Sequence, residues 1–551
     1  METSISDRLF CCPWVRRRVP VAYRDELYHV LMITLPVLIT QILSYMPSFV
    51  NTMFCGRLGN NVMAGYGLAC ATINITTAST GYGLAVACDT LVSQTFGGKN
   101  LLRVGVILQR SILILLLFCL PCWALLINAQ AILLCLGQDP EVARIAQLYI
   151  TAFIPSVPAM YLQHLQVSYL QNQVIILPQM FTAVAANIAN LITNYILVHW
   201  MELGISGSVA ANALWRFYSC GFLFIYIRWK NLHAATWGGW SVESLQEWGS
   251  YMKLAIPTTM MKCFEWWVYE IGGFLAGMLS ENELAAQHAA MMVTLMTYMF
   301  SLGVQAAACA RVGNALGAGD TSRAILVCKI SLTLSASIAL IEGVVLGSAK
   351  NVIGYIFTSD KNIIDLVAHL MNVYCFLQFF DGLVCVCMGI FVGTGKQKIP
   401  AVANLIGYYG IGLPLSVTFI FVAKMRIFGF WLGLLICVIG QSTFFIVVIF
   451  KLNWKRITEE AVKRAHMNKD VNLSQTLPDA HTPECADRLS SSQLIIRRGF
   501  TLLSAVGLFA LGITIHLIVP LPDAYKISLH WLNSTHDSSN ISTLTVQNYT
   551  K

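Results

Sequence analysis

Residues 252–279 read MKLAIPTTMMKCFEWWVYEIGGFLAGML, a mostly apolar stretch that carries two glutamates, Glu265 and Glu270, near its middle. As a helix the stretch is long enough to cross a bilayer, for which about 20 residues suffice. A carboxylate at that depth costs about 2.5–3.5 kcal/mol to insert, and such residues usually face a bundle interior or a water-filled cavity. The stretch therefore predicts a membrane-spanning helix with a polar, functional face.

The composition places the whole chain in the membrane. Of 551 residues, 56% are hydrophobic and only 11% are charged, too apolar for a soluble core. Hydropathy separates about twelve segments of spanning length between residues 30 and 450, and a thirteenth at about 500–520. We therefore expect an all-α polytopic membrane protein. Many of the 17 cysteines lie inside these segments, where they pack as small hydrophobic residues, so we expect neither a disulfide scaffold nor a metal site.

Basic residues set the predicted topology, because cytoplasmic loops are enriched in Lys and Arg. With twelve spans, most of the basic clusters fall on one face, which also explains the net charge of +8 without a nucleic-acid partner. The N-terminus is then cytoplasmic. The predicted segments are a cytoplasmic N-terminal segment (1–29), an N-terminal six-helix bundle (30–230), an inter-bundle cytoplasmic linker (231–252), a C-terminal six-helix bundle (253–450), a disordered cytoplasmic linker (451–498), a thirteenth transmembrane helix (499–521) and an extracellular tail (522–551).

The C-terminal tail is expected to be extracellular and glycosylated. Arg497 and Arg498 precede the thirteenth apolar segment and keep its start cytoplasmic, which sends the tail outside. Three N-glycosylation sequons lie there, at Asn533, Asn540 and Asn548.

The two halves of the chain repeat at an offset of about 220 residues. Leu35-Pro36 corresponds to Ile256-Pro257, and the glycine-rich QTFGGKN (94–100) corresponds to NALGAGD (314–320), each followed by an arginine. Six spans per repeat is an even number, so both halves enter from the same side and form two parallel repeats. Duplicated halves around a shared cavity are typical of a secondary transporter, and no GxxxxGK[ST] nucleotide loop is present.

Several motifs in this order resemble one known family, the multidrug and toxin extrusion (MATE) transporters, in their vertebrate branch with a thirteenth helix. The motifs are CDTLVSQTFG (88–97), GVILQRS (105–111), QDPEV (138–142), ATWGGWS (235–241), EWWVYE (265–270), RVGNALGAGD (311–320), GYIFTSD (354–360) and KLNWK (451–455). The resemblance covers nearly the whole chain. It implies an antiporter that extrudes organic cations, including drugs and toxins, in exchange for protons.

The residues of span 252–279 agree with that chemistry. Glu265 and Tyr269 are one helical turn apart and share a face, whereas Glu270 points about 140° away from Glu265. A poorly hydrated carboxylate can hold either a proton or a cation, so binding of the two is mutually exclusive. Trp266 and Trp267 can add cation–π attraction, or they can instead pack against lipid or the core.

Other polar residues inside apolar segments are candidates of unequal strength. Asp381 is the second proton- or substrate-binding candidate, and the resemblance implies a glutamate at that position. Asn74 and Gln41 can hydrogen-bond a substrate, but contacts between helices explain them equally well. Glu342 is interpreted as a residue of interhelical structure.

The chain departs from the resemblance at Met292, where vertebrate relatives carry another glutamate. His288, one turn earlier, can titrate in its place or be structural. Lys262 lies one turn before Glu265. It can form an ion pair with that glutamate, but its position near the helix start favours a side chain that reaches the cytoplasmic headgroups.

The predicted function is therefore proton-coupled extrusion of organic cations by alternating access at the plasma membrane. Protons are the coupling ion, no cofactor or metal is expected, and a monomer is expected to suffice. Sodium-coupled or facilitative transport of other amphiphilic solutes on the same fold is the alternative, followed by a receptor or channel. An enzyme is not expected, since no HExxH or GxSxG motif is present.

Overall fold

The computed structural model describes residues 20–58, 60–358, 360–466 and 490–519 of the chain, and these are almost entirely helical, with no strand. The helices of the first half are α3 (Val21–Leu58), α4 (Asn60–Ile73), η1 (Asn74–Ala78), α5 (Ser79–Gly97), α6 (Leu101–Ile127), α7 (Ala129–Cys135), α8 (Pro140–Phe153), η2 (Ile154–Ser156), α9 (Val157–Gln171), α10 (Leu177–Asn194), η3 (Tyr195–Trp200), α11 (Gly204–Trp229) and η4 (Val242–Leu245). Those of the second half are α12 (Trp248–Leu279), α13 (Glu281–Gly317), α14 (Thr321–Ile353), η5 (Gly354–Ile356), α15 (Lys361–Thr394), α16 (Lys398–Asn404), η6 (Leu405–Gly412), α17 (Leu413–Val417), η7 (Thr418–Val422) and α18 (Arg426–Lys451), followed by α19 (Trp454–His466) and α21 (Ser491–Ile518).

The predicted class, a polytopic all-helical membrane protein, is confirmed. In the described part of the chain, ten helices are long and apolar enough to cross a membrane by length and composition. Three more reach membrane-spanning length with more polar residues: the continuous rod α4–η1–α5, α11 and α12. Together they make thirteen rods, the number predicted from hydropathy.

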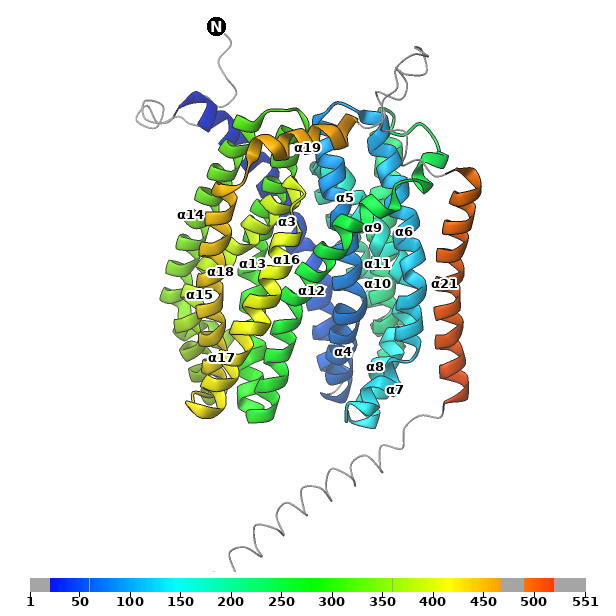
Figure 1. Ribbon diagram of the computed structural model, residues 1–551. Coiled ribbons are helices and arrows are strands. Elements are labelled where there is room, and N and C mark those ends of the chain that lie inside the picture. Colours follow the sequence, from blue (N-terminus) through cyan, green and yellow to red (C-terminus); the bar gives the residue numbers. More distant parts are fainter. Residues whose placement is uncertain (1–19, 59, 359, 467–489, 520–551) are drawn as a thin grey trace, which may run out of the picture.

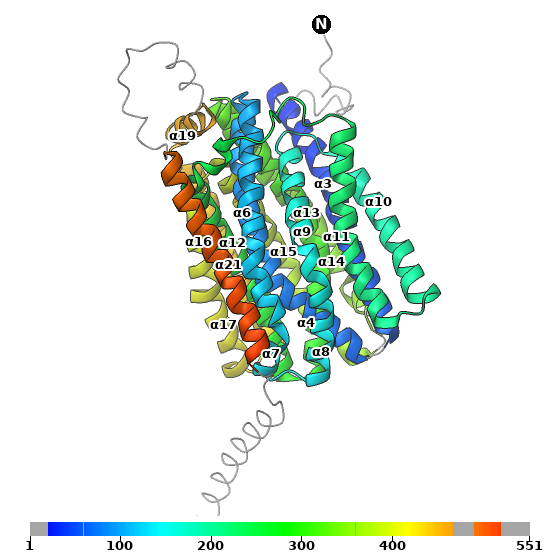
Figure 2. The same ribbon diagram turned by 90° about the vertical axis from the view of Figure 1, so that its right-hand side faces the viewer.

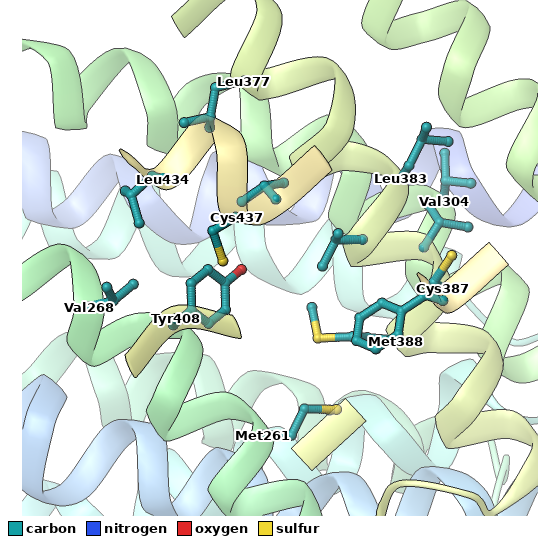
Figure 3. Packing of buried hydrophobic residues seen from close by; sticks show 14 of the residues in the cluster. Met261, Val268, Val304, Leu377, Leu383, Cys387, Met388, Tyr408, Leu434 and Cys437 are labelled. Atoms are coloured by element: carbon teal, nitrogen blue, oxygen red, sulfur yellow. The ribbon is translucent and has the colours of Figure 1, made fainter. Parts of the chain in front are cut away.

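The helices form two groups that stand side by side (Figure 1). One hydrophobic core is built from buried residues between Val62 and Ala255, and a second almost entirely from residues between Met261 and Ala461. Figure 3 shows part of the second core, where Tyr408 lies among apolar side chains from several helices. A smaller cluster around Val30 and Ile33 of α3 includes Ala307 of α13, so α3 also packs against the second half.

The two repeats meet at a reciprocal glycine contact at the ends of α5 and α13. A Cβ on Gly97 would lie 2.1 Å from the backbone oxygen of Asn314, and one on Gly317 would lie 1.9 Å from that of Gln94. Gln94 and Asn314, like Gly97 and Gly317, are related by the repeat offset, so each half makes the same contact with the other. This reciprocity is what a two-fold axis between parallel repeats produces.

Two ion pairs repeat the same symmetry. Arg103 at the start of α6 pairs with Glu247, just before α12, at 3.3 Å, and Arg323 at the start of α14 pairs with Glu26 of α3 at 2.9 Å. Each pair joins one half to the segment that opens the other half. Glu26 also receives two hydrogen bonds from Arg311, at 2.7 and 2.8 Å, which strengthens one of the two links.

The helix α19 lies across the two groups at the end that carries these contacts, the top of Figure 1, which we call the α19 face. Arg464 donates to Oε1 of Gln94 at 2.8 Å, and Asn100 donates to the backbone oxygen of Ala465 at 3.0 Å. On the second half, Lys396 donates to Glu460 at 2.7 Å. The helix therefore links the two halves at this face.

The prediction that residues 451–498 are a disordered linker was wrong in part. Its first portion forms α19, whose buried residues recur with helical spacing: Trp454, Ile457, Thr458, Ala461 and Ala465. The charged residues between them made the segment resemble a polar linker. Helix α21 also begins earlier than predicted, at Ser491 with a capping box from Ser490 and Gln493. Residues 467–489 lie outside the described residues.

Helix α21 packs along α6 at the edge of the first half (Figure 2). A Cβ on Gly512 would lie 2.6 Å from that of Ala124, and Asn128 donates to the backbone oxygen of Gly512 at 2.9 Å. Near its start, Arg498 lies 4.3 Å from the ring centroid of Trp248. Apart from these contacts α21 is largely exposed, as expected of a peripheral membrane-spanning helix.

Gly317→Ala should destabilise the protein, because its Cβ would collide with the backbone of α5 rather than with a movable side chain. The matched control is Gly273→Ala on α12, where a Cβ meets nothing within 4 Å. We expect the apparent Tm in detergent to fall by several degrees for Gly317→Ala and to stay level or rise for Gly273→Ala. Equal values for the two variants would contradict the close crossing.

Glu460 provides a pH test of the link that α19 makes between the two halves. A hydrogen bond from Lys396 lowers the pKa of Glu460 below its usual value of 4.5, so its ionised form stabilises docked α19 above that pH and loses this effect as pH falls. The group is about one-third exposed, so we expect less than about 1 kcal/mol. The Tm deficit of Glu460→Gln relative to the unmodified protein should shrink as pH falls from about 7 to below 4.5. A constant deficit would contradict an ionic role.

Candidate functional site

The centre of the site is an ion pair buried in α12. Nζ of Lys262 lies 3.0 Å from Oε2 of Glu265, and the two residues are 1% and 3% exposed. They are three positions apart, which places them on neighbouring turns of one helix face. The pair neutralises a charge that would otherwise be costly to bury.

This geometry corrects the prediction for Lys262. Its side chain was expected to reach the headgroups, which would leave it exposed, yet it is among the largest fully buried side chains of the described residues. A buried acceptor one turn away outweighs the short distance to the helix start, because the ammonium group gains a partner there without leaving the bundle.

The other carboxylate oxygen of Glu265 is also occupied. The hydroxyl of Tyr298, on α13, donates to Oε1 of Glu265 at 2.5 Å. Both oxygens of Glu265 therefore have a donor. The prediction that Glu265 is the free exchange group stays untested, but in this structure its carboxylate is satisfied by protein groups.

A narrow cavity lies beside Tyr298. Its walls come from α13, α14 and α15, and its lining residues are Thr297, Tyr298, Ser301, Glu342, Tyr374, Gln378, Asp381 and Gly382. None of these lining residues is basic. Such an acidic, hydroxyl-rich cavity within the apolar second half can attract a cation.

Asp381 lines this cavity as the second predicted acid. It is 6% exposed, and its carboxylate makes none of the hydrogen bonds or ion pairs found among the described residues. Two features of α15 place it there. Gly382 follows it, and a Cβ at Gly382 would lie 2.8 Å from Oγ of Ser301, so the glycine lets α13 approach. Ser335 of α14 donates to the backbone oxygen of Gly382 at 3.2 Å and fixes the third wall.

Aromatic side chains surround the ion pair. Trp266 stacks on Tyr82 of α5 with ring centroids 6.1 Å apart and an angle of 17°, a contact between the two halves. Tyr269 lies 6.4 Å from the ring of Trp431, and its buried hydroxyl has no hydrogen-bond partner. The indole nitrogen of Trp267 is likewise buried without a partner. Trp266 is therefore a packing residue at the interface of the halves.

The remaining predicted residues do not line the cavity. Glu270, on the opposite side of α12 from Glu265 as its spacing predicted, is exposed, and so are His288 and Asn74. Asn74 begins the short π-helical turn η1, and Gln41 of α3 is half-buried. The sequons at Asn533, Asn540 and Asn548 lie outside the described residues. The structure thus brings together Lys262, Glu265 and, across Tyr298, Asp381.

Sequence reasoning missed three residues of this arrangement. Tyr298 and Gln378 carry no strong signal in the sequence, since a single tyrosine or glutamine in an apolar helix is usually structural. Glu342 did carry one, as an acid inside a predicted span, and was interpreted as interhelical. The structure places it in the wall of the cavity, beside Asp381.

Two parallel repeats of membrane-spanning helices with buried acids are the architecture of a membrane transporter. The sequence profile of the MatE family matches residues 36–196 and 257–418, one copy in each half. The chain is 48% identical over 494 residues to "Multidrug and toxin extrusion protein 1" of Danio rerio, covering 89% of this chain and 83% of that protein. It is 41% identical over 538 residues to the protein of the same name from Homo sapiens, covering 90% and 94%.

Solved structures agree with this assignment. The eukaryotic MATE transporter AtDTX14 superposes with a TM-score of 0.77 at 26% identity, covering 81% of this chain and all of that one. An outward-facing multidrug resistance MATE family transporter of the MOP superfamily shares the fold, with a TM-score of 0.69 at 14% identity. The chain belongs to the MATE family of multidrug efflux transporters.

The Lys262–Glu265 pair can be tested with a double-mutant cycle. Lys262→Met or Glu265→Gln alone leaves the other residue of the pair buried without its partner. The loss of folding stability for such a change in a buried pair is about 3–5 kcal/mol. The double variant should be more stable than either single one, because no charge is left unpaired. The readout is the apparent Tm in detergent, with Lys253→Met, an exposed lysine of the same helix, as the control. Additive losses would show that the two side chains are not coupled.

Proposed function

We propose that this protein extrudes organic cations in exchange for protons across the plasma membrane. The observation that carries the proposal is Asp381, a carboxylate that is 6% exposed, lines a cavity within the membrane-spanning part and has no partner among the residues that the structure describes. Such a group binds either a proton or a cation to offset its negative charge. Competition between the two ligands for one carboxylate is sufficient for antiport.

Glu265 has a different part in this proposal. Because Lys262 and Tyr298 hold both of its oxygens, a ligand that binds Glu265 must first displace one of them. We assign the primary exchange to Asp381, while the ion pair keeps the neighbouring charge near zero. Tyr298 joins the two sites, since it donates to Glu265 and lines the cavity of Asp381.

The repeat supports alternating access as the transport cycle. The reciprocal glycine crossing and ion pairs close the α19 face symmetrically, and the halves have separate cores, so they can rotate against each other as units. Trp266 and Tyr82 stack where the halves meet, so a rotation would change the surroundings of the ion pair.

The relatives named for multidrug and toxin extrusion support an organic-cation substrate. Sodium-coupled or facilitative transport remains the second candidate, because carboxylate and hydroxyl oxygens also suit alkali cations. The two candidates differ in the driving gradient, so the choice between them is experimental. In this proposal the transporter needs no cofactor. Protons are the coupling ion, and a monomer is the working unit.

Uptake of radiolabelled tetraethylammonium into acid-loaded proteoliposomes tests the proposal. The unmodified protein should accumulate the probe only with an outward-directed proton gradient, and Asp381→Asn should reduce the rate at least about ten-fold, because the amide cannot ionise. Asp365→Asn, an exposed change on the same helix, should leave the rate unaltered.

Equal uptake with and without the pH gradient would refute proton coupling. Dependence on NaCl but not on KCl would favour the sodium-coupled alternative. Unchanged, gradient-driven uptake by Asp381→Asn would keep proton coupling but remove Asp381 from the exchange step.

A further inference from the structure

Glu342 lies on the face of α14 that packs against its own bundle. Ala339 and Leu346 are buried, and Glu342 and Gly343 are half-buried, a set that recurs with the spacing of one helix face. The residues between them are highly exposed and apolar, as expected of a lipid-facing surface: Leu340, Ile341, Val344 and Val345. The glutamate therefore points away from lipid and into the cavity between α13, α14 and α15.

The carboxylate of Glu342 is not satisfied by the protein. Its Oε1 is buried without a hydrogen-bond partner, and no basic residue lines the cavity. An interhelical role would require a donor on a neighbouring helix, and the described residues provide none at this atom. The unpaired oxygen argues for a ligand rather than for structure.

Gln378 provides an independent observation at the same place. The residue is 5% exposed, and its Nε2 donates to the backbone oxygen of Ala339 at 2.7 Å, which ties α15 to α14. Its Oε1 is buried without a partner. Gly343 makes this contact possible, because a Cβ there would lie 3.0 Å from Nε2 of Gln378. The amide thus presents an acceptor, not a donor, to the cavity that Glu342 and Asp381 line.

The cavity has an excess of acceptors and of negative charge. Oε1 of Glu342 and Oε1 of Gln378 are buried without a hydrogen-bond partner, and the carboxylate of Asp381 makes no hydrogen bond or ion pair found among the described residues. The nearby Glu265 is already neutralised by Lys262. A ligand that satisfies this set needs positive charge and several N–H donors. The cavity is narrow, so it does not admit an entire drug, and a cationic head group enters it only when the surrounding helices move apart.

We propose that Glu342 is a substrate-binding residue, which together with Asp381 and Gln378 forms a subsite for cationic head groups rich in N–H donors, such as guanidinium and primary ammonium. Quaternary ammonium groups carry the charge but no N–H, so they leave the acceptors unsatisfied and bind less well. The inference rests on the proposed function and specifies its substrate class. It also gives the acid of α14 a role that the predicted interhelical contact did not.

The test compares two probes that share a benzyl group and a single positive charge, benzylguanidinium and benzyltrimethylammonium. Binding to the purified full-length protein is measured by isothermal titration calorimetry. We expect the unmodified protein to prefer benzylguanidinium by about ten-fold or more, which corresponds to one or two charged hydrogen bonds. Glu342→Gln should weaken benzylguanidinium by about ten-fold and benzyltrimethylammonium by less, because only the former loses N–H bonds to a carboxylate.

Glu342→Leu gives a second variant that needs no buried polar partner and should fold, and it should abolish the preference. Asp365→Asn is the control for loss of an acidic charge on a neighbouring helix. Changes below about two-fold for both probes in both Glu342 variants, or no preference in the unmodified protein, would overturn the inference. So would displacement of benzylguanidinium by NaCl but not by KCl, which would make the cavity a sodium site.

Binding and transport separate the two proposals. Binding that depends on Glu342 in a protein without proton-driven uptake would retain the subsite and reject the proposed coupling. Proton-driven uptake by a protein whose Glu342 variants bind both probes normally would retain the coupling and reject the subsite.

Discussion

The cost of an unpaired charge in a dry interior determines which groups of this protein can work. Lys262 and Glu265 neutralise each other within one turn of α12, and Tyr298 donates a hydrogen bond to the remaining oxygen of the glutamate. The pair therefore carries no net charge as long as it is intact. Because Glu265 already has its partners, a positive ligand is needed instead in the cavity beside Tyr298. Within the described residues, neither Asp381 nor Oε1 of Glu342 has a donor there.

The helix that holds the pair is also the helix that joins the two halves. A Cβ on Gly83 of α5 would lie 2.3 Å from the Cα of Thr259, so α5 and α12 touch backbone to backbone one turn from Lys262. Asn404 donates to the backbone oxygen of Met261 at 2.9 Å from the opposite side. The ion pair thus lies on a helix that contacts both halves. A rearrangement of the halves must reach it, which is how events at the cavity and closure of the α19 face can be coupled.

The sequence predicted the fold well because membrane insertion leaves little choice. Long apolar segments must be helices, and the offset of about 220 residues between QTFGGKN and NALGAGD reappears as the reciprocal contact of Gly97 and Gly317. Side-chain partners were harder to predict. Lys262 was placed wrongly because the distance to the helix end is visible in sequence, whereas burial by neighbouring helices is not. Amphipathic α19 was mistaken for a linker because five buried positions were diluted by charged neighbours.

The acids of this chain illustrate the difference between fold and specificity. The family resemblance implies a glutamate at Met292 of α13, whereas Glu342 of this chain lies on α14. Met292 does not line the cavity, and it lies about 9 Å along the helix from Tyr298. Glu342 lines the same cavity as Asp381, so it does not take the position of the missing acid. Packing depends on apolar surface and glycines, whereas the choice of a cation depends on the arrangement of acceptors in the cavity wall. The same fold can for this reason present different acceptors to a cation.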